Sequence, residues 1–467
     1  MNISKNKWGT MNKVIILAAG EGTRMKSNIS KVLHKLCNRP ILSYMIDASI
    51  ESKVDEVIVI VGNNEDQVKE AFGDRVKYVK QEIGEGIPYG TGYAVKLVED
   101  YIGDNDNILV LTGDVPLISK ETLVGLMDKQ NKENNLATVL TADFEDPSGY
   151  GRIVKDAKGQ FKKIVEHKDC SPEELKVKEI NSGIQVFNGE KLKYALNKLD
   201  TNNSQGELYL TDVFDILQEE RGKIDTYKLS DNEEIMGIND KIQLAQVEKV
   251  MRRRINESYM RDGVILENPE TITIEKGVKI GKDTIIEQNT KILGNTEIGE
   301  NCLIGMNTRI NDAKIGNNVT IFSSFIDQAV VGDGSDVGPF ARLRPKAELK
   351  ENVHVGNFVE VKNAVLDDGV KAGHLAYIGD ADLGKRVNVS CGVIFSNYDG
   401  KNKFRSTIGD DAFLGANVNI VSPINVADKG FLAAGSTITK DVAEGELAVE
   451  RSEQKNIKGY YTRKFGE

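Results

Sequence analysis

The sequence predicts an α/β doubly wound (Rossmann-like) domain followed by a parallel β-helix of hexapeptide repeats. Three observations support this fold class. Short β-branched runs alternate with amphipathic stretches up to about residue 240, a stretch without Gly or Pro covers 240–261, and a period of six residues begins at 264. A chain of 467 residues is also too long for a single hydrophobic core, so at least two domains are expected.

Composition excludes several classes of protein. With 28% charged residues and a formal net charge of −10, the chain does not have the basic character of a general nucleic-acid binder. Its apolar runs, such as VIVIV at 57–61, are too short to span a membrane, and its N-terminus lacks the apolar core of a secretory signal. Four widely spaced cysteines form no CxxC pair and predict a reducing, cytoplasmic location: Cys37, Cys170, Cys302 and Cys391.

The first half has the pattern of a parallel sheet covered by helices. VIILAAG (14–20), EVIVIVG (56–62) and NILVLTGD (107–114) are continuous apolar runs typical of buried parallel strands. RPILSYMIDASIES (39–52) between the first two predicts a helix with Pro40 in its first turn. This βαβ order predicts the doubly wound domain.

Five segments are predicted along the chain. Met11 begins a new apolar pattern, so the residues before it are expected to be a polar tail, and DKIQLAQVEKVMRRRINESYMR is expected to be one connecting helix. The predicted segments are a tail at 1–10, the nucleotide-site domain at 11–240, a linker helix at 241–262, the β-helix at 263–450 and a C-terminal tail at 451–467.

The β-helix is predicted from two columns of residues at a period of six. The large column comprises Ile274, Ile280, Ile286, Ile292, Ile298, Ile304 and Ile310, then Val331, Val337, Leu343, Leu349, Val355 and Val361, then Leu366, Ala372 and Ile378, and finally Ile408, Leu414, Ile420, Val426, Leu432 and Ile438. A smaller residue stands two positions before most of these, as at Thr284, Thr290, Thr296, Cys302 and Thr308. Two inward columns at this period are the signature of hexapeptide solenoids.

A phosphate site is predicted where the first strand ends, in LAAGEGTRM (17–25). Gly20 and Gly22 allow the backbone N–H groups to approach a phosphate, and Arg24 and Lys31 can neutralise its charge. Asp114 follows a buried strand at the carboxyl end of the sheet, where open α/β sheets bind ligands. A carboxylate beside phosphates is typical of a Mg²⁺ site.

These motifs, in this order, resemble those of sugar-1-phosphate nucleotidyltransferases. They are LAAGEGTRM, KVLH (31–34), LTGDVPL (111–117), GYGRI (149–153), VEHKD (165–169), EINSGI (179–184) and GIND (237–240). Together with the hexapeptide half, nearly the whole chain resembles the bifunctional bacterial N-acetylglucosamine-1-phosphate uridyltransferase / glucosamine-1-phosphate acetyltransferase family. The resemblance implies that the β-helix is left-handed, that the chain forms a homotrimer, and that it supplies UDP-N-acetylglucosamine for cell-wall precursors without binding nucleic acid or membrane.

The resemblance also implies residue roles in the first site, where UTP and N-acetylglucosamine-1-phosphate would react. Uridine would contact Leu17, Ala18, Ala19 and Gly20, the triphosphate Arg24 and Lys31, and the base Gln81, Gly90 and Thr91. Asp114 and Asn239 would hold Mg²⁺, and Gly151, Glu166 and Asn181 would bind the sugar. This chain departs from the family between Gln81 and Gly90, where eight residues stand instead of a few, and at Tyr93, where a histidine is common.

A second site is predicted on the β-helix from residues outside the two columns. Arg344 and Lys362 follow core positions 18 residues apart, so they should lie on one face about 4.8 Å apart. Like charges this close repel unless an anion lies between them, and a sugar phosphate would suit. Tyr377 should lie on the same face one coil further on, Asn388 on the neighbouring face, and His374 at the corner between them.

The resemblance assigns these positions to acetyl transfer from acetyl-CoA to glucosamine-1-phosphate. His374 would be the general base. Arg344 and Lys362 would bind the phosphate, with Tyr377 and Asn388 beside it. Acetyl-CoA would contact Cys391, Asn397, Tyr398, Ala416, Ala434 and Arg451, partly from a loop at 390–407 that reaches a neighbouring subunit.

Two alternatives remain open on the sequence. One is a nucleotidyltransferase of another specificity, such as an adenylyltransferase acting on glucose-1-phosphate, whose solenoid serves only regulation or trimerisation. The other is a non-catalytic subunit that acts as a scaffold. The first would not require the cluster of Arg344, Lys362 and His374, and the second would not require both Asp114 and Lys31.

Overall fold

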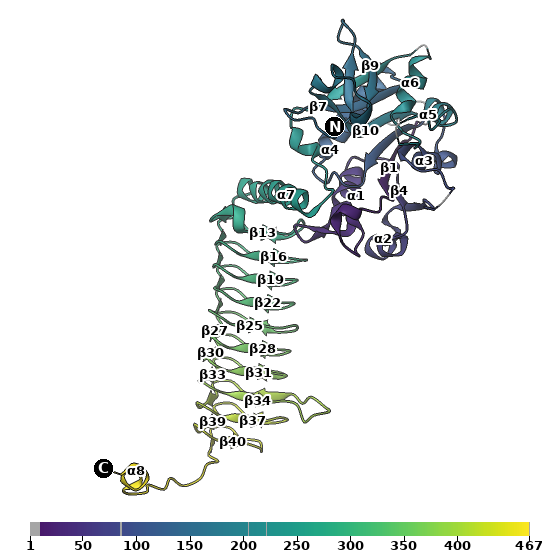
Figure 1. The fold of residues 1–467 in the computed structure, drawn as a ribbon. Helices are drawn as coiled ribbons and strands as arrows, with labels where there is room; N and C mark the ends of the chain where they lie inside the picture. The colour runs from purple at the N-terminus through teal and green to yellow at the C-terminus, as the bar shows by residue number, and fades with distance from the viewer. Residues whose placement is uncertain (1–9, 85, 204, 221, 467) are drawn as a thin grey trace. The chain divides into compact units, whose positions relative to one another are not determined.

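The computed structural model describes residues 10–84, 86–203, 205–220 and 222–466 (Figure 1). The predicted tail at 1–10 therefore lies outside the described residues except for Thr10. The chain divides into two compact units, the first ending at Met251 and the second beginning at Arg252. No described helix is long and apolar enough to cross a membrane. The predicted domain limits at 240 and 263 stay predictions.

The first unit is built on a nine-stranded mixed sheet with the order β11-β7-β10-β6-β1-β4-β5, extended by β8 and β9 beside β10. Its strands are β1 (Asn12–Ala18), β4 (Glu56–Val61), β5 (Lys77–Lys80), β6 (Asn107–Thr112), β7 (Ala137–Asp143), β8 (Arg152–Lys155), β9 (Phe161–Val165), β10 (Glu179–Asn188) and β11 (Ile224–Lys228). Strand β1 pairs in parallel with both β4 and β6, as the continuous apolar runs predicted.

Helices pack on both faces of this sheet. Val14 and Ile16 of β1 face one apolar cluster, which includes residues of α1 (Ile41–Glu51) and α4 (Lys120–Glu133). Ile15 faces the other cluster, which includes residues of α3 (Thr91–Lys96), α5 (Gly189–Leu196) and α6 (Asp212–Gln218). The described helices also include α2 (Glu65–Phe72), α7 (Lys241–Arg261) and α8 (Tyr460–Phe465). The doubly wound architecture is confirmed.

The helix predicted at 39–52 is shorter at its start. Arg39 and Pro40 form strand β3, which pairs with β2 (Lys35–Leu36), and α1 begins at Ile41. Pro40 has φ −55° and ψ 141°, so its backbone is extended and it precedes the helix instead of lying in the first turn. The predicted helix at 240–261 is observed as α7 at Lys241–Arg261.

Three parallel sheets form the second unit, and its strands stack as successive rungs in Figure 1. Face 1 contains β12 (Ile265–Leu266), β15 (Ile285–Ile286), β18 (Leu303–Ile304), β21 (Thr320–Ile321), β24 (Asp336–Val337), β27 (His354–Asn357), β30 (Lys371–His374), β33 (Asn388–Val389), β36 (Phe413–Leu414), β39 (Phe431–Leu432) and β41 (Leu447–Ala448). Face 2 contains β13 (Thr273–Ile274), β16 (Lys291–Leu293), β19 (Arg309–Asn311), β22 (Phe325–Asp327), β25 (Arg342–Leu343), β28 (Glu360–Lys362), β31 (Tyr377–Gly379), β34 (Ile394–Ser396), β37 (Asn419–Val421) and β40 (Thr437–Ile438).

Face 3 completes each triangular coil. It contains β14 (Lys279–Ile280), β17 (Glu297–Ile298), β20 (Lys314–Ile315), β23 (Val330–Val331), β26 (Glu348–Leu349), β29 (Val365–Leu366), β32 (Ala381–Leu383), β35 (Ser406–Ile408) and β38 (Asn425–Val426). The predicted fold class, a nucleotidyltransferase-type domain followed by a left-handed parallel β-helix, is confirmed.

Both predicted columns point inward and form one continuous apolar cluster. Three threonines of the small column, Thr284, Thr290 and Thr296, pair their hydroxyls inside it, whereas the buried hydroxyl of Thr308 has no partner among the described residues. Buried Thr284, for example, donates from its hydroxyl to Gly299 O at 2.8 Å and accepts from Cys302 N at 3.1 Å. At the first three positions threonine therefore fills a narrow interior position without leaving a buried hydroxyl unpaired.

Candidate active sites

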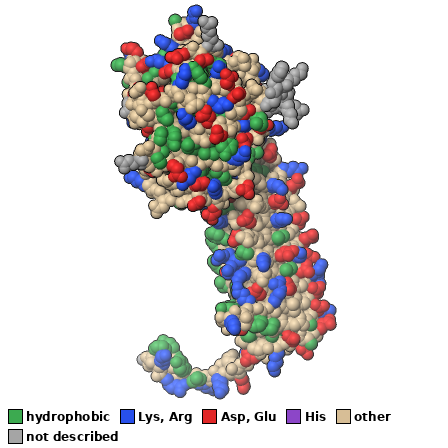
Figure 2. Space-filling model, turned by 90° about the vertical axis from the view of Figure 1, so that its right-hand side faces the viewer, with side chains coloured by type: hydrophobic (Ala, Val, Ile, Leu, Met, Phe, Trp, Pro, Cys, Tyr) green, Lys and Arg blue, Asp and Glu red, His purple; other side chains and the backbone are tan. Residues whose placement is uncertain are grey.

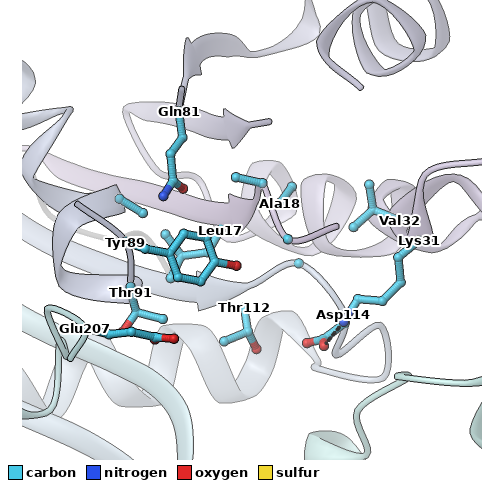
Figure 3. A pocket seen from close by; sticks show the side chains of 15 residues that line it. Leu17, Ala18, Lys31, Val32, Gln81, Tyr89, Thr91, Thr112, Asp114 and Glu207 are labelled. Atoms are coloured by element: carbon cyan, nitrogen blue, oxygen red, sulfur yellow. Dashed lines mark hydrogen bonds and ion pairs between the residues drawn. The ribbon is translucent and has the colours of Figure 1, made fainter. Parts of the chain in front are cut away.

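The first site is a cavity of about 280 Å³ at the carboxyl ends of β1 and β6 (Figure 3). The structure brings nine of the predicted residues to its wall: Leu17, Ala18, Ala19, Gly20, Lys31, Gln81, Gly90, Thr91 and Asp114. The end of β1 is held tightly in this wall, because a Cβ atom on Gly113 would lie only 2.6 Å from Leu17 O. Backbone atoms therefore border the cavity at the point where the sequence predicted a nucleotide.

Charged and amide groups from distant segments converge at one end of the cavity. The Lys31 ammonium lies 2.5 Å from Asp114 Oδ2 and 3.3 Å from Asn239 Oδ1. Arg24 donates to the same Asn239 oxygen at 2.9 Å. Gly22 makes room for Lys31, because a Cβ atom there would lie 2.7 Å from Lys31 Cβ. Two oxygen donors around a single cation are a ligand set that suits a divalent metal ion.

The three residues predicted to bind the sugar form a separate group. Asn181 N donates to Gly151 O at 2.8 Å, and a Cβ atom on Gly151 would lie 3.5 Å from both Asn181 Cβ and Glu166 Oε2. Burial raises the pKa of Glu166, which accepts from the Thr211 hydroxyl at 3.2 Å. Tyr150 directly precedes Gly151, and burial, followed by the charge of Asp114, raises its pKa.

Six residues that line the cavity were not predicted as site residues: Val32, Tyr89, Ala94, Thr112, Gly113 and Glu207. The signal for Tyr89 was present, because it ends the long segment at 82–89, of which the structure describes all but residue 85. Glu207 had no signal, because it approaches Gly90 only through tertiary pairing. Thr91 has a structural contact as well, since its hydroxyl accepts from Leu210 N at 3.1 Å.

On the β-helix, the predicted cation pair lies on face 2. Leu343 and Val361 are in register, and Arg344 N donates to Val361 O at 2.9 Å, so Arg344 lies beside Lys362. Arg344 also forms an ion pair with Glu360 at 2.7 Å. The pKa of Lys362 is lowered, first by the close approach of the Lys403 side chain, then by desolvation and by the charges of Lys403 and Arg344. An anion at this position would relieve the repulsion.

Lys403 was missed by the sequence analysis, although it lies in the basic loop KNKFR that interrupts the period of six. The three cations, Arg344, Lys362 and Lys403, give the site a stronger positive charge than the pair that was predicted. We call these three residues the cation cluster.

Tyr377 and Asn397 extend the cation cluster toward the next coil. Gly379 is in register with Lys362, and a Cβ atom on Gly379 would lie 2.4 Å from Tyr377 Oη and 2.8 Å from Asn397 Nδ2. Both polar groups therefore occupy the space that a side chain at 379 would need. Asn397 is buried and donates to Asp380 Oδ2 at 2.5 Å.

His374 ends strand β30 at the corner between faces 1 and 2, as predicted, and its side chain is exposed. The residues in the equivalent place on successive coils form a row along this corner. Asn357 is in register with His374, and backbone bonds from Gly392 N to His374 O, Asn417 N to Cys391 O and Gly435 N to Ala416 O continue it. The row is Asn357, His374, Cys391, Ala416 and Ala434, and we call it the corner row.

Three residues predicted to contact acetyl-CoA therefore follow the predicted base along one edge. Arg451 lies at the end of the corner row and donates to Ala434 O at 2.8 Å. Tyr398 is exposed and donates to Gly400 O at 2.6 Å. Asn388 lies on face 1 and donates to Ser390 Oγ at 3.0 Å. The small side chains at 391, 416 and 434 leave room for an extended ligand.

The fold and the two sites are those of an enzyme with a nucleotidyltransferase domain and a hexapeptide-repeat acyltransferase domain. Residues 13–232 match the nucleotidyl transferase family model, 269–366 match the GMPPB C-terminal domain, and 406–440 match the hexapeptide repeat of succinyl-transferase. Both kinds of domain were predicted from the sequence.

Curated relatives cover almost the whole chain. Bifunctional protein GlmU of Clostridioides difficile (strain 630) is 48% identical over 452 residues, which is 97% of this chain and 98% of the relative. The protein of the same name from Enterococcus faecalis is 49% identical over 447 residues (96% and 97%), and that from Alkaliphilus oremlandii is 50% identical over 452 residues (97% and 98%). The chain belongs to the Bifunctional protein GlmU family. The predicted family membership is confirmed.

Proposed function

We propose that the chain makes UDP-N-acetylglucosamine, a cell-wall precursor, in two reactions. The β-helix acetylates glucosamine-1-phosphate with acetyl-CoA, and the α/β unit transfers UMP from UTP to the N-acetylglucosamine-1-phosphate produced. The observation that carries this proposal is the presence of two distinct polar sites, the Lys31–Asp114–Asn239 group in the first unit and the corner row with the cation cluster in the second. A regulatory solenoid or a scaffold would need only one of these sites or neither.

In the uridylyl site, a phosphate oxygen of the sugar attacks the α-phosphorus of UTP and pyrophosphate leaves. The reaction depends on positioning and on neutralisation of charge more than on a proton acceptor. Lys31 and Arg24 provide positive charge at the triphosphate end of the cavity. Gly151, Glu166 and Asn181 hold the sugar beside it.

Asp114 and Asn239 fit a divalent metal ion, for which we propose Mg²⁺. Their oxygens already share one cationic partner, the Lys31 ammonium, so both can approach a single positive charge. Among the described residues no group of three His, Cys, Asp or Glu side chains could hold a metal. A site with few protein ligands is typical of Mg²⁺, which retains waters and substrate oxygens. When bound, the ion would neutralise charge on the phosphates.

In the acetyl site, His374 accepts a proton from the 2-amino group of glucosamine-1-phosphate as its nitrogen attacks the thioester carbonyl. The N–C bond forms, the C–S bond breaks, and the proton is available to the departing CoA thiolate. Arg344 and Lys362 bind the phosphate, and Tyr377 and Asn388 contact the sugar. Acetyl-CoA extends along the corner row from Cys391 past Ala416 to Ala434, with Arg451 at its end.

We propose that the active form is a homotrimer. Phe358 directly follows Asn357 of the corner row, Leu375 directly follows His374, and Phe340 has the equivalent place one coil earlier. These three large apolar residues, Phe340, Phe358 and Leu375, are 60%, 55% and 57% exposed. Each has a positive φ (61°, 62° and 51°), a conformation that costs residues other than glycine about 1–2 kcal/mol. Figure 2 shows apolar side chains along one edge of the second unit, near lysine and arginine side chains. Burial against another copy would offset the strain.

The proposed substrates and the cysteines agree with a cytoplasmic location. The four cysteines are free in the described part of the chain, and free thiols persist in a reducing compartment.

The test is to supply the full-length protein with glucosamine-1-phosphate, acetyl-CoA, UTP and Mg²⁺ and to detect UDP-N-acetylglucosamine by mass. Free CoA and pyrophosphate are measured separately, with each substrate omitted in turn. We expect CoA to be released when UTP is omitted. We also expect pyrophosphate to be released when acetyl-CoA is omitted, provided that N-acetylglucosamine-1-phosphate is supplied. Pyrophosphate release from ATP and glucose-1-phosphate, with no CoA release, would instead support the adenylyltransferase alternative. Absence of both products would support the scaffold.

A further inference from the structure

We propose that the aromatic ring of Tyr89 stacks on the uracil of UTP and thereby positions the nucleotide. This inference rests on the proposed uridylyl function of the cavity. It assigns a role to the unusually long 82–89 segment, which would deliver an aromatic residue to the base subsite. The ring would hold the base against the wall formed by Leu17 and Ala18 at the end of β1.

The backbone of Tyr89 is fixed, although the segment before it is long. Tyr89 O accepts from Leu208 N at 2.8 Å, and Gly92 N donates to Leu208 O at 2.8 Å. Gly90 between them has φ 117°, and a Cβ atom on it would lie 2.4 Å from Leu208 O. This close pairing attaches residues 89–92 to 208–210, so the ring of Tyr89 starts from a defined point at the cavity wall.

The ring borders the cavity without being buried in it. Tyr89 lines the cavity together with Leu17 and Gln81, and it is 44% exposed. In Figure 3 the Tyr89 ring lies in front of Leu17, between Gln81 and Glu207. An aromatic face that is partly open to a cavity can accept a planar ligand, and base–aromatic stacking does not require hydrogen bonds of fixed geometry.

The charges in the cavity indicate which part of a nucleotide reaches Tyr89. Lys31 and Asp114 lie at one end of the view in Figure 3, and Glu207 lies at the other end with Tyr89. Glu207 lines the cavity at this end, and burial, followed by the charges of Glu207 and Glu21, raises the pKa of Tyr89. Phosphates would be repelled there and attracted to Lys31. A neutral, planar base therefore suits the Tyr89 end.

The test measures UTP binding to the full-length protein with Mg²⁺ by titration calorimetry, together with steady-state kinetics of uridylyl transfer. The variants are Tyr89→Ala, which removes the ring, and Tyr89→Phe, which keeps it. Tyr194→Ala is the matched control, because Tyr194 is 38% exposed in the same unit and does not line the cavity. Inorganic tripolyphosphate serves as a competitor that carries the phosphates without a base.

We expect Tyr89→Ala to weaken UTP binding and to raise the KM for UTP about tenfold, with a smaller change in kcat. Tyr89→Phe should recover most of the affinity, and Tyr194→Ala should match the parent. Inhibition by tripolyphosphate should be equal in all four proteins. The stacking role would be overturned if Tyr89→Ala lost as much affinity for tripolyphosphate as for UTP, or if its UTP binding were unchanged. It would also be overturned if Tyr89→Phe bound UTP as weakly as Tyr89→Ala. A parent protein that fails to bind UTP would instead contradict the proposed uridylyl function itself.

Discussion

His374 Nδ1 lies 3.0 Å from Asn357 Oδ1, one coil away in the corner row. An amide oxygen can only accept a hydrogen bond, so Nδ1 carries the proton and donates it. The other ring nitrogen, Nε2, is then unprotonated in the neutral imidazole and is the atom that can accept a proton from the substrate amine. The amide of Asn357 thus selects the tautomer that the proposed general base requires.

Replacing the base should affect turnover more than binding. His374→Ala removes the proton acceptor and leaves the cation cluster intact, so kcat for acetyl transfer should fall about 10²–10⁴-fold with a smaller change in KM for glucosamine-1-phosphate. Steady-state measurement of CoA release tests this. The control is His354→Ala, because His354 lies on face 1 and contacts Asp336 instead of the corner row. Near-normal acetyl transfer by His374→Ala would show that the histidine is only a corner residue.

Changing the partner of the base should move the pH profile. A general base must be neutral to accept a proton, so the rate of acetyl transfer should rise with pH on the acid side. In Asn357→Asp the new carboxylate would stabilise the imidazolium, and the rising limb should move to higher pH. Asn357→Ala should lower kcat by a smaller factor than His374→Ala without that displacement. Identical pH profiles for the parent and Asn357→Asp would contradict the contact.

The cation cluster should act through substrate binding. Arg344→Ala removes a phosphate contact that is present before the reaction, so we expect a higher KM for glucosamine-1-phosphate with kcat affected less. A charge-assisted bond of about 1.5–3 kcal/mol corresponds to roughly 10–100-fold. Arg309→Ala is the control, because Arg309 is an exposed arginine of face 2 two coils away. If kcat fell while KM stayed unchanged, Arg344 would not act by binding the phosphate before the reaction.

The two activities should separate by mutation, because their residues lie in different units. Asp114→Ala removes a carboxylate at the phosphate end of the cavity, so pyrophosphate release should fall at least about 10²-fold while CoA release is retained. Both products are assayed on the same preparation. Asp128→Ala is the control, because Asp128 is a half-exposed carboxylate of α4 that does not line the cavity. Loss of both activities in a folded Asp114→Ala protein would reject the model of two sites.

The trimer should depend on the apolar residues at the corner. Asparagine adopts the positive φ of 62° at position 358 more readily than phenylalanine does, so Phe358→Asn should not harm the coil. The variant nevertheless removes apolar surface. We therefore expect weaker assembly and slower acetyl transfer, with uridylyl transfer retained. Light scattering should give three times the 51.5 kDa of the chain for the parent and a lower mass for the variant on dilution. Val330→Asn on face 3 is the control. A parent monomer with full acetyl transfer would contradict the trimer.

Alkylation should identify the thiol nearest to the acetyl site. Cys391 follows His374 in the corner row, whereas burial raises the pKa of Cys170 and of Cys302 and makes those thiols less reactive. Iodoacetamide should slow acetyl transfer, spare uridylyl transfer and act more slowly when acetyl-CoA is present. Cys391→Ala should resist it. A Cys391→Ala protein inhibited as strongly as the parent would exclude this thiol.

The sequence by itself determined the fold class and, on the β-helix, the relative positions of most site residues. A parallel β-helix repeats by translation, so a place in the hexad defines a face, and one uninterrupted coil takes 18 residues or one or two fewer. For that reason Arg344 could be placed beside Lys362, and His374 at the corner, before any coordinates. The nucleotide cavity was located equally well, because parallel strands end at a common edge of the sheet.

Only the tertiary structure decided the contacts that no period encodes. Asn239 meets Lys31 across 208 positions of sequence, and Tyr89 pairs with Leu208. Lys403 reaches Lys362 from a loop that interrupts the hexads, and Asn397 is buried against Asp380 instead of lying in an open groove. Each of these contacts depends on how a non-repeating segment packs against a distant one. Local sequence patterns carry no information about such packing, because its free energy arises only when both segments are folded.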